Sequence, residues 1–361
     1  MTDQFTGDYA LEPMPAPAVH PGEFVIAAAS LEHGHIYGMC RGLVEAGATV
    51  EWVFDRDAEK AAAFTRSFPG ARIAASLDEI LNEPNVRLVC AAAVPNERAN
   101  LGVRVMEAGK DYFTDKTPLT TLDQLGRVRR TAERTGRKYF VYYSERIHSE
   151  AGVYAGQLVE RGVIGRPGHV DGFGPHRIGP PESRPDWFYD HARYGGILCD
   201  IGSHQIEQFL FYCGCSDAQV KCAHGDNFAH KVYPGLEDFG AATLIGDTGA
   251  TQHFRVDWLT PEGLSTWGDG RVFILGTEGY IELRKYVNVA SHDGTHDHVY
   301  VVDSRGERHF DVSGRVGYPF FRDVILDCLN RTERAMTQAH ALKAAELCVK
   351  AQLAANAPFG D

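Results

Sequence analysis

The chain has 361 residues, of which 44% are hydrophobic, so it is long enough for two domains that each bury a core. Its net charge is −12 and it has no long basic run, which disfavours a nucleic-acid partner. No apolar stretch approaches the length of a membrane span, and the first residues lack the positive start and apolar core of a signal peptide. Eight cysteines, several in apolar segments such as residues 88–93, favour reduced thiols, so we expect a cytoplasmic protein without a membrane partner.

Residues 1–22 are polar and contain several prolines, and they predict an N-terminal arm that is either loosely ordered or packed on a neighbouring subunit. From Phe24 onward, strands and helices alternate. Strands are expected at residues 24–29, 49–54, 87–93, 112–114 and 138–143, with helices up to 46 and at 58–68, 97–108 and 122–135. Strands separated by helices form a parallel sheet covered on both faces, so residues 23–147 are predicted to be an α/β domain of the dinucleotide-binding, or Rossmann, type.

After residue 147 the pattern changes. A helix is expected at 153–161 and a strand near 169–173, followed by a long loop rich in Pro, Gly and His and by a helix that begins near Asp200. Short strands come next, at 219–223, 239–245, 250–257, 272–275, 280–284 and 299–302, and then helices at 321–328 and 339–355. Their close spacing and turn residues indicate a largely antiparallel sheet, so residues 148–361 are predicted to be an α+β domain.

A carboxylate and an imidazole, Asp200 and His204, stand four residues apart at the predicted start of the helix near residue 200. That spacing places both side chains on one helix face, and Gly202 between them leaves room for another group. Ile206 and Phe209 fall on a different face, which can anchor the helix. Imidazole titrates near neutral pH and a carboxylate can orient it, so the pair predicts general acid–base chemistry; the alternative is a solvated polar face.

The turn after the first strand is where a cofactor pyrophosphate is expected to bind the backbone N–H groups at the start of a helix. The first glycine of the G-x-G-x-x-G fingerprint is absent here, and the two glycines present, at 34 and 38, are spaced G-x-x-x-G. The residues of this turn that are predicted to contact the cofactor are Ser30, His33, Gly34, His35 and Ile36.

Asp55 ends the second predicted strand, and an acidic side chain there accepts hydrogen bonds from the adenosine ribose and repels a 2′-phosphate. This favours NAD over NADP, although the adjacent Arg56 could recruit that phosphate. The alternative role for Asp55 is a helix N-cap, and the two roles do not exclude each other. Val94, Pro95 and Asn96 follow the third predicted strand, where a doubly wound sheet exposes its ligand crevice.

Lys116 follows the fourth predicted strand, in the sequence Asp115-Lys116-Thr117-Pro118. A lysine at the carboxyl end of a parallel strand points toward the ligand crevice. Its ammonium can hold a substrate hydroxyl and stabilise the alkoxide character that develops as hydride leaves. An exposed surface lysine is the alternative.

Together with Tyr143-Ser-Glu-Arg146 and with Gly-Gly-x-x-x-Asp-x-Gly-x-His over residues 195–204, this pattern resembles the Gfo/Idh/MocA family, the glucose–fructose oxidoreductase and inositol dehydrogenase group. The resemblance covers residues 23–355. The Glu-Lys-Pro motif of that family stands here with Asp115 for glutamate and with one extra residue before the proline, whereas the Asp-x-Gly-x-His motif matches in full.

The resemblance implies that Lys116 and His204 form the catalytic pair and that Asp200 contacts substrate or orients the imidazole. It also implies that Asn96 lies near the cofactor. Beyond the altered glycine turn, the chain departs from the family at Ala99, where relatives often have histidine, and at Ser144, where they usually have asparagine; Ser144 stays a candidate cofactor contact.

The family's usual chemistry implies an NAD(P)-dependent dehydrogenase that oxidises a secondary hydroxyl of a sugar, sugar derivative or cyclitol, with NAD as the expected cofactor. Two other hypotheses stay open: an enzyme that retains NAD and cleaves a glycosidic bond through transient oxidation, and a non-catalytic NAD and sugar sensor. The presence of Lys116 with Asp200 and His204 argues against the sensor, which needs no proton transfer. The family also implies a homodimer or homotetramer, in which another copy covers the open sheet face of the second domain.

The loop at 176–188, together with Arg193, is predicted to line the substrate cleft. His176 and Arg193 can bind hydroxyls or a carboxylate, and Arg146 of the family motif joins them. Trp187 can stack on a pyranose ring, or it can simply pack the loop down. Histidines and aspartates at 292–298 have metal-ligand chemistry, but a polar hairpin loop is the favoured interpretation, so no metal is expected.

Overall fold

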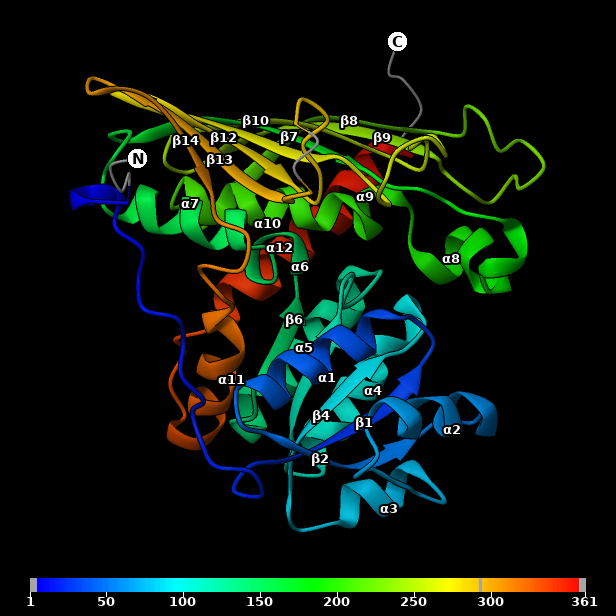
Figure 1. Ribbon diagram of the computed structural model, residues 1–361. Coiled ribbons are helices and arrows are strands. Elements are labelled where there is room, and N and C mark those ends of the chain that lie inside the picture. The colour runs from blue at the N-terminus through cyan, green and yellow to red at the C-terminus, as the bar shows by residue number, and fades with distance from the viewer. Residues whose placement is uncertain (1–4, 292–293, 357–361) are drawn as a thin grey trace. The chain divides into compact units, whose positions relative to one another are not determined.

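The computed structural model describes residues 5–291 and 294–356 (Figure 1). Within this range the strands form a six-stranded and an eight-stranded sheet, and the chain divides into two compact units, one around each sheet. The six-stranded unit contains residues 15–142 and 318–342, and the eight-stranded unit contains the other described residues. The contiguous domains 23–147 and 148–361 stay a prediction; in the units observed, each sheet also gathers a segment from the far end of the chain.

The six-stranded sheet is parallel throughout, with the order β3-β2-β1-β4-β5-β6. Its strands are β1 (Val25–Leu31), β2 (Thr49–Phe54), β3 (Arg72–Ile73), β4 (Val86–Ala92), β5 (Asp111–Asp115) and β6 (Tyr139–Tyr142). Its helices are α1 (His35–Glu45), α2 (Ala58–Ser67), α3 (Leu77–Asn82), α4 (Pro95–Glu107), α5 (Leu122–Thr135) and α11 (Pro319–Asn330). Only the short β3 and α3 lack a counterpart in the sequence analysis, because two and six residues give too little periodicity.

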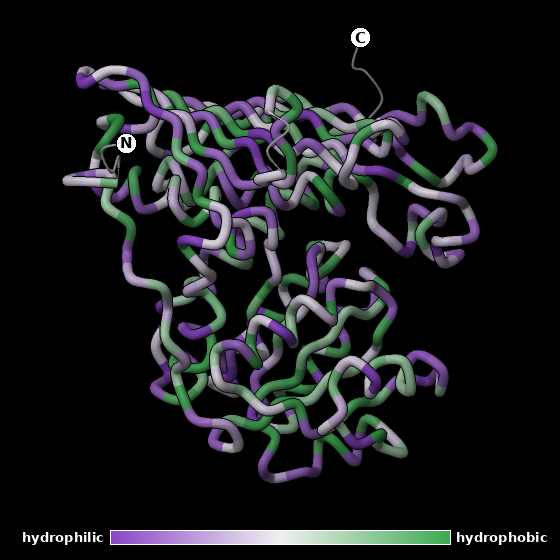
Figure 2. Tube along the Cα trace, viewed as in Figure 1, coloured by the Kyte–Doolittle hydropathy of each residue, from purple (hydrophilic) through white to green (hydrophobic). Residues whose placement is uncertain are grey.

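Burial on both faces explains the composition of the central strands. β1 and β4 are apolar and buried along nearly their whole length, as parallel strands are when helices cover both sides of a sheet. α1 packs with α11 and α4 packs with α5, and Figure 2 shows hydrophobic residues along the strands of this unit. Because the strands are parallel, the carboxyl ends of β1, β2, β4 and β5 meet at one edge of the sheet. The loops that the sequence analysis predicted to bind the cofactor follow these strand ends.

The eight-stranded sheet has the order β14-β13-β12-β11-β7-β10-β9-β8 and is antiparallel except for the parallel pair of β7 and β10. Its strands are β7 (Pro167–Pro175), β8 (Ala218–Asp226), β9 (Phe239–Gly246), β10 (Thr251–Asp257), β11 (Gly270–Gly276), β12 (Gly279–Lys285), β13 (Asp297–Asp303) and β14 (Gly306–Asp311). The predicted fold class, a Rossmann-type α/β part followed by an α+β part with a largely antiparallel sheet, is confirmed. The polar and mostly exposed β14 escaped prediction because it lacks a clear apolar alternation.

Helices α7 (Glu150–Glu160) and α10 (Gly202–Tyr212) cover one face of this sheet, and Figure 1 draws no helix on the opposite face of the described strands. The remaining helices are α6 (Ser144–Ile147), α8 (His191–Tyr194), α9 (Ile197–Asp200) and α12 (Gln338–Ala355), with short 3-10 turns at Gly7–Tyr9, Pro181–Ser183 and Asp186–Tyr189. Every residue of α10 from Gly202 to Leu210 is buried. The alternative of a solvated polar face around His204 is therefore wrong. Helix α10 packs against strands β7 and β10 and against helices α6 and α9, which exclude water from this side chain.

The N-terminal arm packs on its own chain. The rings of Phe5 and Tyr9 lie 5.1 and 5.6 Å from that of Phe310, and the Tyr154 hydroxyl donates a hydrogen bond to the Tyr9 carbonyl. The alternative of a loosely ordered arm therefore does not describe Phe5 and Tyr9, whereas packing of the arm on a neighbouring subunit stays a prediction. Two aromatic side chains in this otherwise polar segment supply the anchor that composition alone did not reveal.

All eight cysteines are free thiols, and all except Cys222 are buried. Burial, followed by the charge of Cys215, raises the pKa of Cys213 to about 12, so this thiol stays protonated near neutral pH. None of the described helices combines the length and the hydropathy that a bilayer crossing demands.

Two helical glycines provide a matched test of packing in the six-stranded unit. A Cβ at Gly102, on α4, would overlap the buried rings of Tyr112 and Tyr139, whereas a Cβ at Gly126, on α5, would meet only the flexible guanidinium of Arg130, at 3.2 Å. We expect Gly102→Ala to destabilise the protein by about 1–3 kcal/mol through overpacking. Gly126→Ala should be neutral or stabilising by up to about 1 kcal/mol, because alanine is the better helix former. Chemical denaturation measures both, and equal effects would contradict the close approach at Gly102.

Candidate functional site

The turn between β1 and α1 contains two histidines, His33 and His35, on either side of Gly34. Ser30 has a left-handed backbone, with φ of 55°, which is unusual for a residue with a side chain and redirects the chain near the end of β1. Gly34 is the N-cap of α1, and a Cβ there would meet no atom within 4 Å, so the loop is open on that side. The side chains of His33 and His35 both extend toward Asp115, at the end of β5.

Asp115 is fully buried, and four nitrogen atoms lie close to its carboxylate oxygens. These are Lys116 N and His35 Nδ1, both at 2.8 Å, and His33 Nδ1 and Arg98 Nη2, both at 3.2 Å. Burial acts to raise the pKa of Asp115, but the charges of His35, Arg98 and His33 outweigh it and hold the pKa well below its ordinary value. An ionised carboxylate therefore joins the β1–α1 turn to the end of β5.

The two imidazoles of this turn pack edge to face, with ring centroids 4.2 Å apart. Burial, followed by the charge of His35, lowers the pKa of His33 to about 4, against the opposite effect of Asp115. His33 is therefore neutral at neutral pH and can donate only one ring hydrogen.

Arg98, on α4, is the fixed counter-charge of Asp115. It is 1% exposed; Nε donates to the Ala93 carbonyl at 2.7 Å, and Nη1 donates to the carbonyls of Lys116 and Thr117. These bonds fix the backbone around Lys116, which is itself buried. Sequence reasoning missed Arg98, because no motif distinguishes it from the other arginines of the helices.

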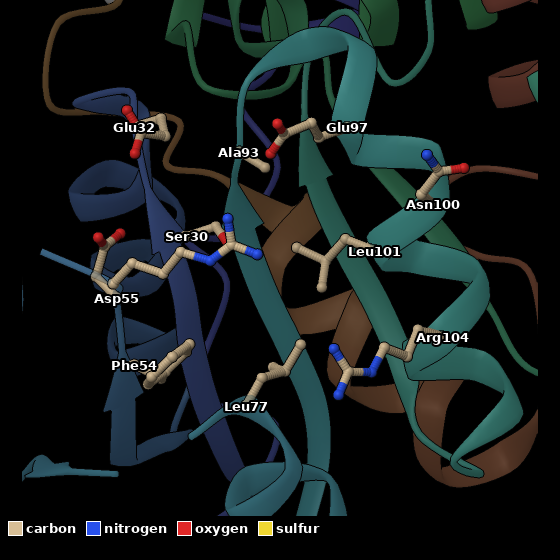
Figure 3. A pocket seen from close by; sticks show the side chains of 11 residues that line it. Ser30, Glu32, Phe54, Asp55, Leu77, Ala93, Glu97, Asn100, Leu101 and Arg104 are labelled. Atoms are coloured by element: carbon tan, nitrogen blue, oxygen red, sulfur yellow. The ribbon is translucent and has the colours of Figure 1, made fainter. Parts of the chain in front are cut away.

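Beside this network lies a cavity of about 450 Å³ (Figure 3). The residues that line it are Ser30, Glu32, Phe54, Asp55, Arg56, Leu77, Ala93, Glu97, Asn100, Leu101 and Arg104. Figure 3 shows Asp55 and Phe54 on one side of the cavity, at the end of β2, and Leu101 and Arg104 of α4 on the other. A hollow of this size at the carboxyl edge of a parallel sheet fits one end of a dinucleotide.

Asp55 lines this cavity with a carboxylate that is already oriented. One oxygen accepts a hydrogen bond from Leu31 N at 2.5 Å and the other from Asp57 N at 2.8 Å. The N-cap of α2 is Asp57, which accepts hydrogen bonds from two amides of the first turn, so the N-cap alternative for Asp55 is wrong. Each oxygen of Asp55 keeps a lone pair for a hydroxyl donor, which suits a ribose.

Val94, Pro95 and Asn96 form the start of α4, with Val94 as the N-cap and Pro95 in the first turn. The side-chain oxygen Oδ1 of Asn96 is buried and has no hydrogen-bond partner among the described residues. A buried acceptor without a donor is costly, and a ligand N–H or O–H would satisfy it. This acceptor, the oriented carboxylate of Asp55 and the cavity show that the residues present fit NAD.

Asp200 and His204 lie on two consecutive helices, not on one. Asp200 ends α9, Ile201 keeps a helical backbone with φ of −80° and ψ of −37°, and His204 is the third residue of α10. Gly195 and Gly196 before α9 have φ values of 89° and 87°, in the left-handed region that favours glycine. The predicted single helix is thus wrong in this detail, and the paired glycines of the motif make the turn into α9.

His204 is buried within a polar cluster that the sequence analysis missed. The centre of the cluster is the ion pair of Glu145, on α6, with Lys285, on β12, whose Nζ lies 2.8 Å from Oε2. Gln205 Nε2 donates to the same oxygen at 3.0 Å, and Lys285 also donates to Gln208 Oε1 at 3.1 Å. A buried ion pair needs such additional hydrogen bonds to offset its loss of hydration.

Glu145 is coupled electrostatically to both imidazoles of this region. Burial acts to raise its pKa, but Lys285, His204 and His176 lower the pKa to about 2. The Oε1 atom of Glu145 lies 4.0 Å from His176 Nε2. The only sequence signal for Glu145 was its position next to Arg146 in the family motif, and nothing in the β12 pattern marked Lys285 as buried.

Two predicted substrate residues have structural partners instead of an open environment. Arg146 Nε donates to Glu207 at 2.8 Å, and its guanidinium lies 3.8 Å from the ring centre of Phe211. Trp187 is only 5% exposed and packs against Phe188, with ring centroids 6.1 Å apart. Little of the Trp187 ring is therefore available to a sugar.

The other predicted contacts of this unit keep some exposure. His176 is half-buried, with ring centroids 5.3 and 4.5 Å from those of Trp258 and Trp267. Arg193 on α8 and Ser144 at the start of α6 are also intermediate in exposure. These three side chains therefore remain candidates for ligand contacts.

One group of described side chains has the spacing of metal ligands. His33, His35 and Asp115 each place a ligand-type atom within 4.8 Å of the others. Arg98 already stands 3.2 Å from the Asp115 carboxylate and opposes a second cation there. We therefore interpret the group as a hydrogen-bonded network.

The second segment considered for a metal is only partly described. His292 and Asp293 lie outside the described residues. His296 pairs with Asp297 at 2.9 Å, and His298 is fully buried. Asp297 also accepts hydrogen bonds from residues at the start of α7, which is a structural role.

The buried Glu145–Lys285 pair predicts a specific stability defect. Lys285→Met keeps the length of the side chain but leaves Glu145 ionised without its main partner, and should destabilise the protein by about 3–5 kcal/mol. The double variant Glu145→Gln with Lys285→Met removes both charges and should recover much of that loss. Urea denaturation at neutral pH measures the three proteins, and equal stability of Lys285→Met and wild type would contradict a charged Glu145.

The same pair predicts the direction of the pH dependence. Because the folded pKa of Glu145, about 2, lies below its ordinary value of 4.5, its stabilising contribution is fully present above pH 4.5 and is lost as pH falls through 2. The double variant should therefore lose less stability than wild type over this interval.

The comparisons with known proteins agree with this architecture. Residues 28–143 match the profile of the oxidoreductase family with an NAD-binding Rossmann fold, and residues 153–282 match that of the GFO/IDH/MocA C-terminal domain. Among curated proteins, scyllo-inositol 2-dehydrogenase (NAD+) of Bacillus subtilis is 25% identical over 241 residues, which are 65% of this chain and 63% of the relative. The match therefore spans less than two thirds of that relative's length.

Solved structures extend the similarity over the described fold. A crystal structure from Erwinia carotovora atroseptica SCRI1043, assigned only provisionally as an oxidoreductase, is 50% identical, with a TM-score of 0.89 over 92% of this chain and 99% of that one. An oxidoreductase from Agrobacterium radiobacter in complex with NAD+, L-tartaric acid and magnesium is 18% identical, with a TM-score of 0.76 over 92% and 96% of the two chains, and shares the fold. Since the two profiles cover more than half of its length, the chain belongs to the Gfo/Idh/MocA oxidoreductase family and contains that family's NAD-binding Rossmann domain.

Proposed function

We propose that the protein is an NAD-dependent dehydrogenase that oxidises a secondary hydroxyl of a sugar, sugar derivative or cyclitol. The observation that carries the proposal is the buried imidazole of His204, coupled to the ionised carboxylate of Glu145. Such an imidazole has the chemistry of a general base. It accompanies an NAD-binding domain in the same chain, and the named activity of the Bacillus subtilis relative supports the substrate class.

The cofactor is held by the carboxyl edge of the six-stranded sheet. Asp55 accepts hydrogen bonds from the adenosine ribose, and the turn around Gly34, at the start of α1, receives the pyrophosphate. Asn96 supplies its buried acceptor to a donor of the ligand. The full set of cofactor contacts proposed is Ser30, His33, Gly34, His35, Ile36, Asp55, Arg56, Val94, Pro95, Asn96, Asp115, Lys116 and Ser144.

The reacting hydroxyl is bound by Lys116 and deprotonated by His204. Bound NAD supplies a nicotinamide C4 atom that accepts the hydride. The ammonium of Lys116 stabilises the alkoxide character of the oxygen while His204 takes its proton. Asp200 orients the imidazole or contacts the substrate, and the charge of Glu145 stabilises the imidazolium that forms.

His176 and Arg193 are the side chains proposed to bind the other substrate hydroxyls, because both are partly exposed. Arg146 and Trp187 have partners that argue for packing roles. The homodimer or homotetramer implied by the family stays a prediction, with the helix-free face of the eight-stranded sheet as its proposed contact.

His204→Ala should lower turnover by about 10²–10⁴-fold, because a positioned proton acceptor is lost. The affinity for NADH should stay unchanged, since His204 is not among the proposed cofactor contacts, all of which except Ser144 belong to the six-stranded unit. Initial rates of NADH formation with polyols, aldoses and sugar acids measure the first quantity, and NADH fluorescence titration measures the second. The control is His253→Ala, an exposed position on β10, which should leave both unchanged.

Two outcomes would contradict these roles. Equal loss of turnover and NADH affinity in His204→Ala would argue against a general base. Cleavage of glycosides without net NADH formation would favour the NAD-retaining alternative, and NADH binding with no turnover of any compound would favour the sensor.

Asp55→Ala should reduce the preference for NAD+ over NADP+ by about tenfold or more, because the variant no longer repels a 2′-phosphate while Arg56 still attracts it. Dissociation constants for NADH and NADPH measure the change. The matched control is Asp57→Ala, which removes the N-cap of α2 and costs about 1 kcal/mol of stability but leaves the cofactor preference unchanged. An equal shift in both variants would mean that Asp55 acts through the local fold alone.

A further inference from the structure

We propose that Asp115 positions the dinucleotide-binding turn, by fixing the side chains of His33 and His35 on either side of Gly34 and so holding the turn in the conformation that receives the pyrophosphate. This inference rests on the proposed NAD-dependent function. It replaces a direct cofactor contact by Asp115, which is fully buried, with an action through His33 and His35.

Two imidazoles in a turn that lacks the first fingerprint glycine create a steric problem that the structure solves. Glycines in this turn normally allow the backbone to approach the pyrophosphate. Here an imidazole stands on each side of Gly34, close to the amides that begin α1. Both rings are directed away from the open side of Gly34, since His35 Nδ1 lies 2.8 Å from one oxygen of Asp115 and His33 Nδ1 lies 3.2 Å from the other.

Asp115 is itself immobilised, so it can act as a fixed point for the turn. Its oxygens also accept hydrogen bonds from Lys116 N and from Arg98, and Arg98 is bonded in turn to the Ala93 carbonyl. The ring of His35 also meets the ring of Tyr142 edge to face, at 5.5 Å. The position of the turn is therefore set by β5 and α4 in addition to its own backbone.

Removing the charge of Asp115 distinguishes two roles of this residue: electrostatic repulsion of the pyrophosphate, and positioning of the two histidines. A carboxylate near a pyrophosphate is repulsive, so removal of its charge would tighten cofactor binding if that repulsion were its main effect. If Asp115 acts by position, removal of the charge releases the histidines and weakens binding. The two roles thus predict opposite signs.

Asp111 provides a matched control on the same strand. It begins β5, is 2% exposed, and accepts hydrogen bonds from Lys138 N at 2.8 Å and from Arg331 at 2.6 and 2.9 Å. Asp111→Asn therefore removes a buried carboxylate with an arginine partner, as Asp115→Asn does, but at the opposite end of the strand.

The test measures dissociation constants for three probes with the full-length protein. NADH and ADP-ribose contain the pyrophosphate, whereas AMP contains only the adenosine monophosphate end. We expect Asp115→Asn to weaken NADH and ADP-ribose binding by about tenfold or more and to leave AMP binding unchanged, since only the turn is displaced. Asp111→Asn should bind all three probes as wild type does, even if both variants melt at lower temperature.

A double-mutant cycle tests whether Asp115 acts through the histidines. The variant with His33→Ala and His35→Ala keeps the buried carboxylate, so it also serves if Asp115→Asn fails to fold. It should bind NADH and ADP-ribose more weakly than wild type, and adding Asp115→Asn should weaken them no further.

Three results would overturn the inference: tighter or unchanged NADH binding by Asp115→Asn, an equal loss of AMP binding, or additive effects in the cycle. If wild-type protein fails to bind NADH, the proposed function is itself overturned. If wild type binds NADH and the cycle is additive, only the positioning role of Asp115 is lost.

Discussion

A carboxylate with no exposure to water must be compensated by the protein, and the compensation of Asp115 organises the candidate cofactor site. Arg98 supplies the charge and reaches from α4 to the backbone of β5, which also fixes the peptide units around Lys116. His33 and His35 complete the shell from the β1–α1 turn. One buried ion pair therefore connects three elements at the edge of the sheet where a dinucleotide binds.

The eight-stranded unit uses the same physical device. Glu145 and Lys285 are both buried, and their mutual attraction is supplemented by the amides of Gln205 and Gln208. The result is a permanent negative charge that acts on His204. A base must gain a positive charge during proton abstraction, so a fixed anion in a water-poor environment stabilises the product of that step more than it would in solvent. Under the proposed mechanism, a buried charge that would cost stability if unpaired thus assists proton transfer when it is paired.

The sequence predicted what depends on local pattern and on topology. Buried apolar runs identified the central strands, and the rule that ligands bind at the carboxyl edge of a parallel sheet placed Asp55 beside the cavity and Lys116 at the end of β5. It missed what depends on tertiary partners. Charged residue types are usually exposed, so the sequence did not mark Arg98, Glu145 and Lys285 as buried. Only the fold shows that each is buried against an opposite charge.

The break between α9 and α10 is a subtler case. The spacing of Asp200 and His204 is compatible with one helix, and no proline stands between them to mark an end; Gly202, the first residue of α10, was interpreted only as room for another group. Gly195 and Gly196 were interpreted only as part of the family motif. In the structure both have positive φ values, and the turn that they make sets the start of α9. The paired glycines thus indicate where α9 begins, whereas the residue spacing does not indicate where it ends.

Two departures from the family pattern that look independent in the sequence are one feature in space. The turn after β1 lacks the first fingerprint glycine and contains two histidines, and the motif that begins at the last residue of β5 has Asp115 for glutamate. Aspartate is one methylene shorter, and the structure fills the space in front of its carboxylate with the two imidazoles, at 2.8 and 3.2 Å. A longer side chain at 115 would push its oxygens into the rings, and a turn without the histidines would leave the shorter one with only Lys116 N and Arg98 as partners. The two changes are therefore physically complementary, which explains how a Rossmann domain can keep its cofactor edge without the usual glycine fingerprint.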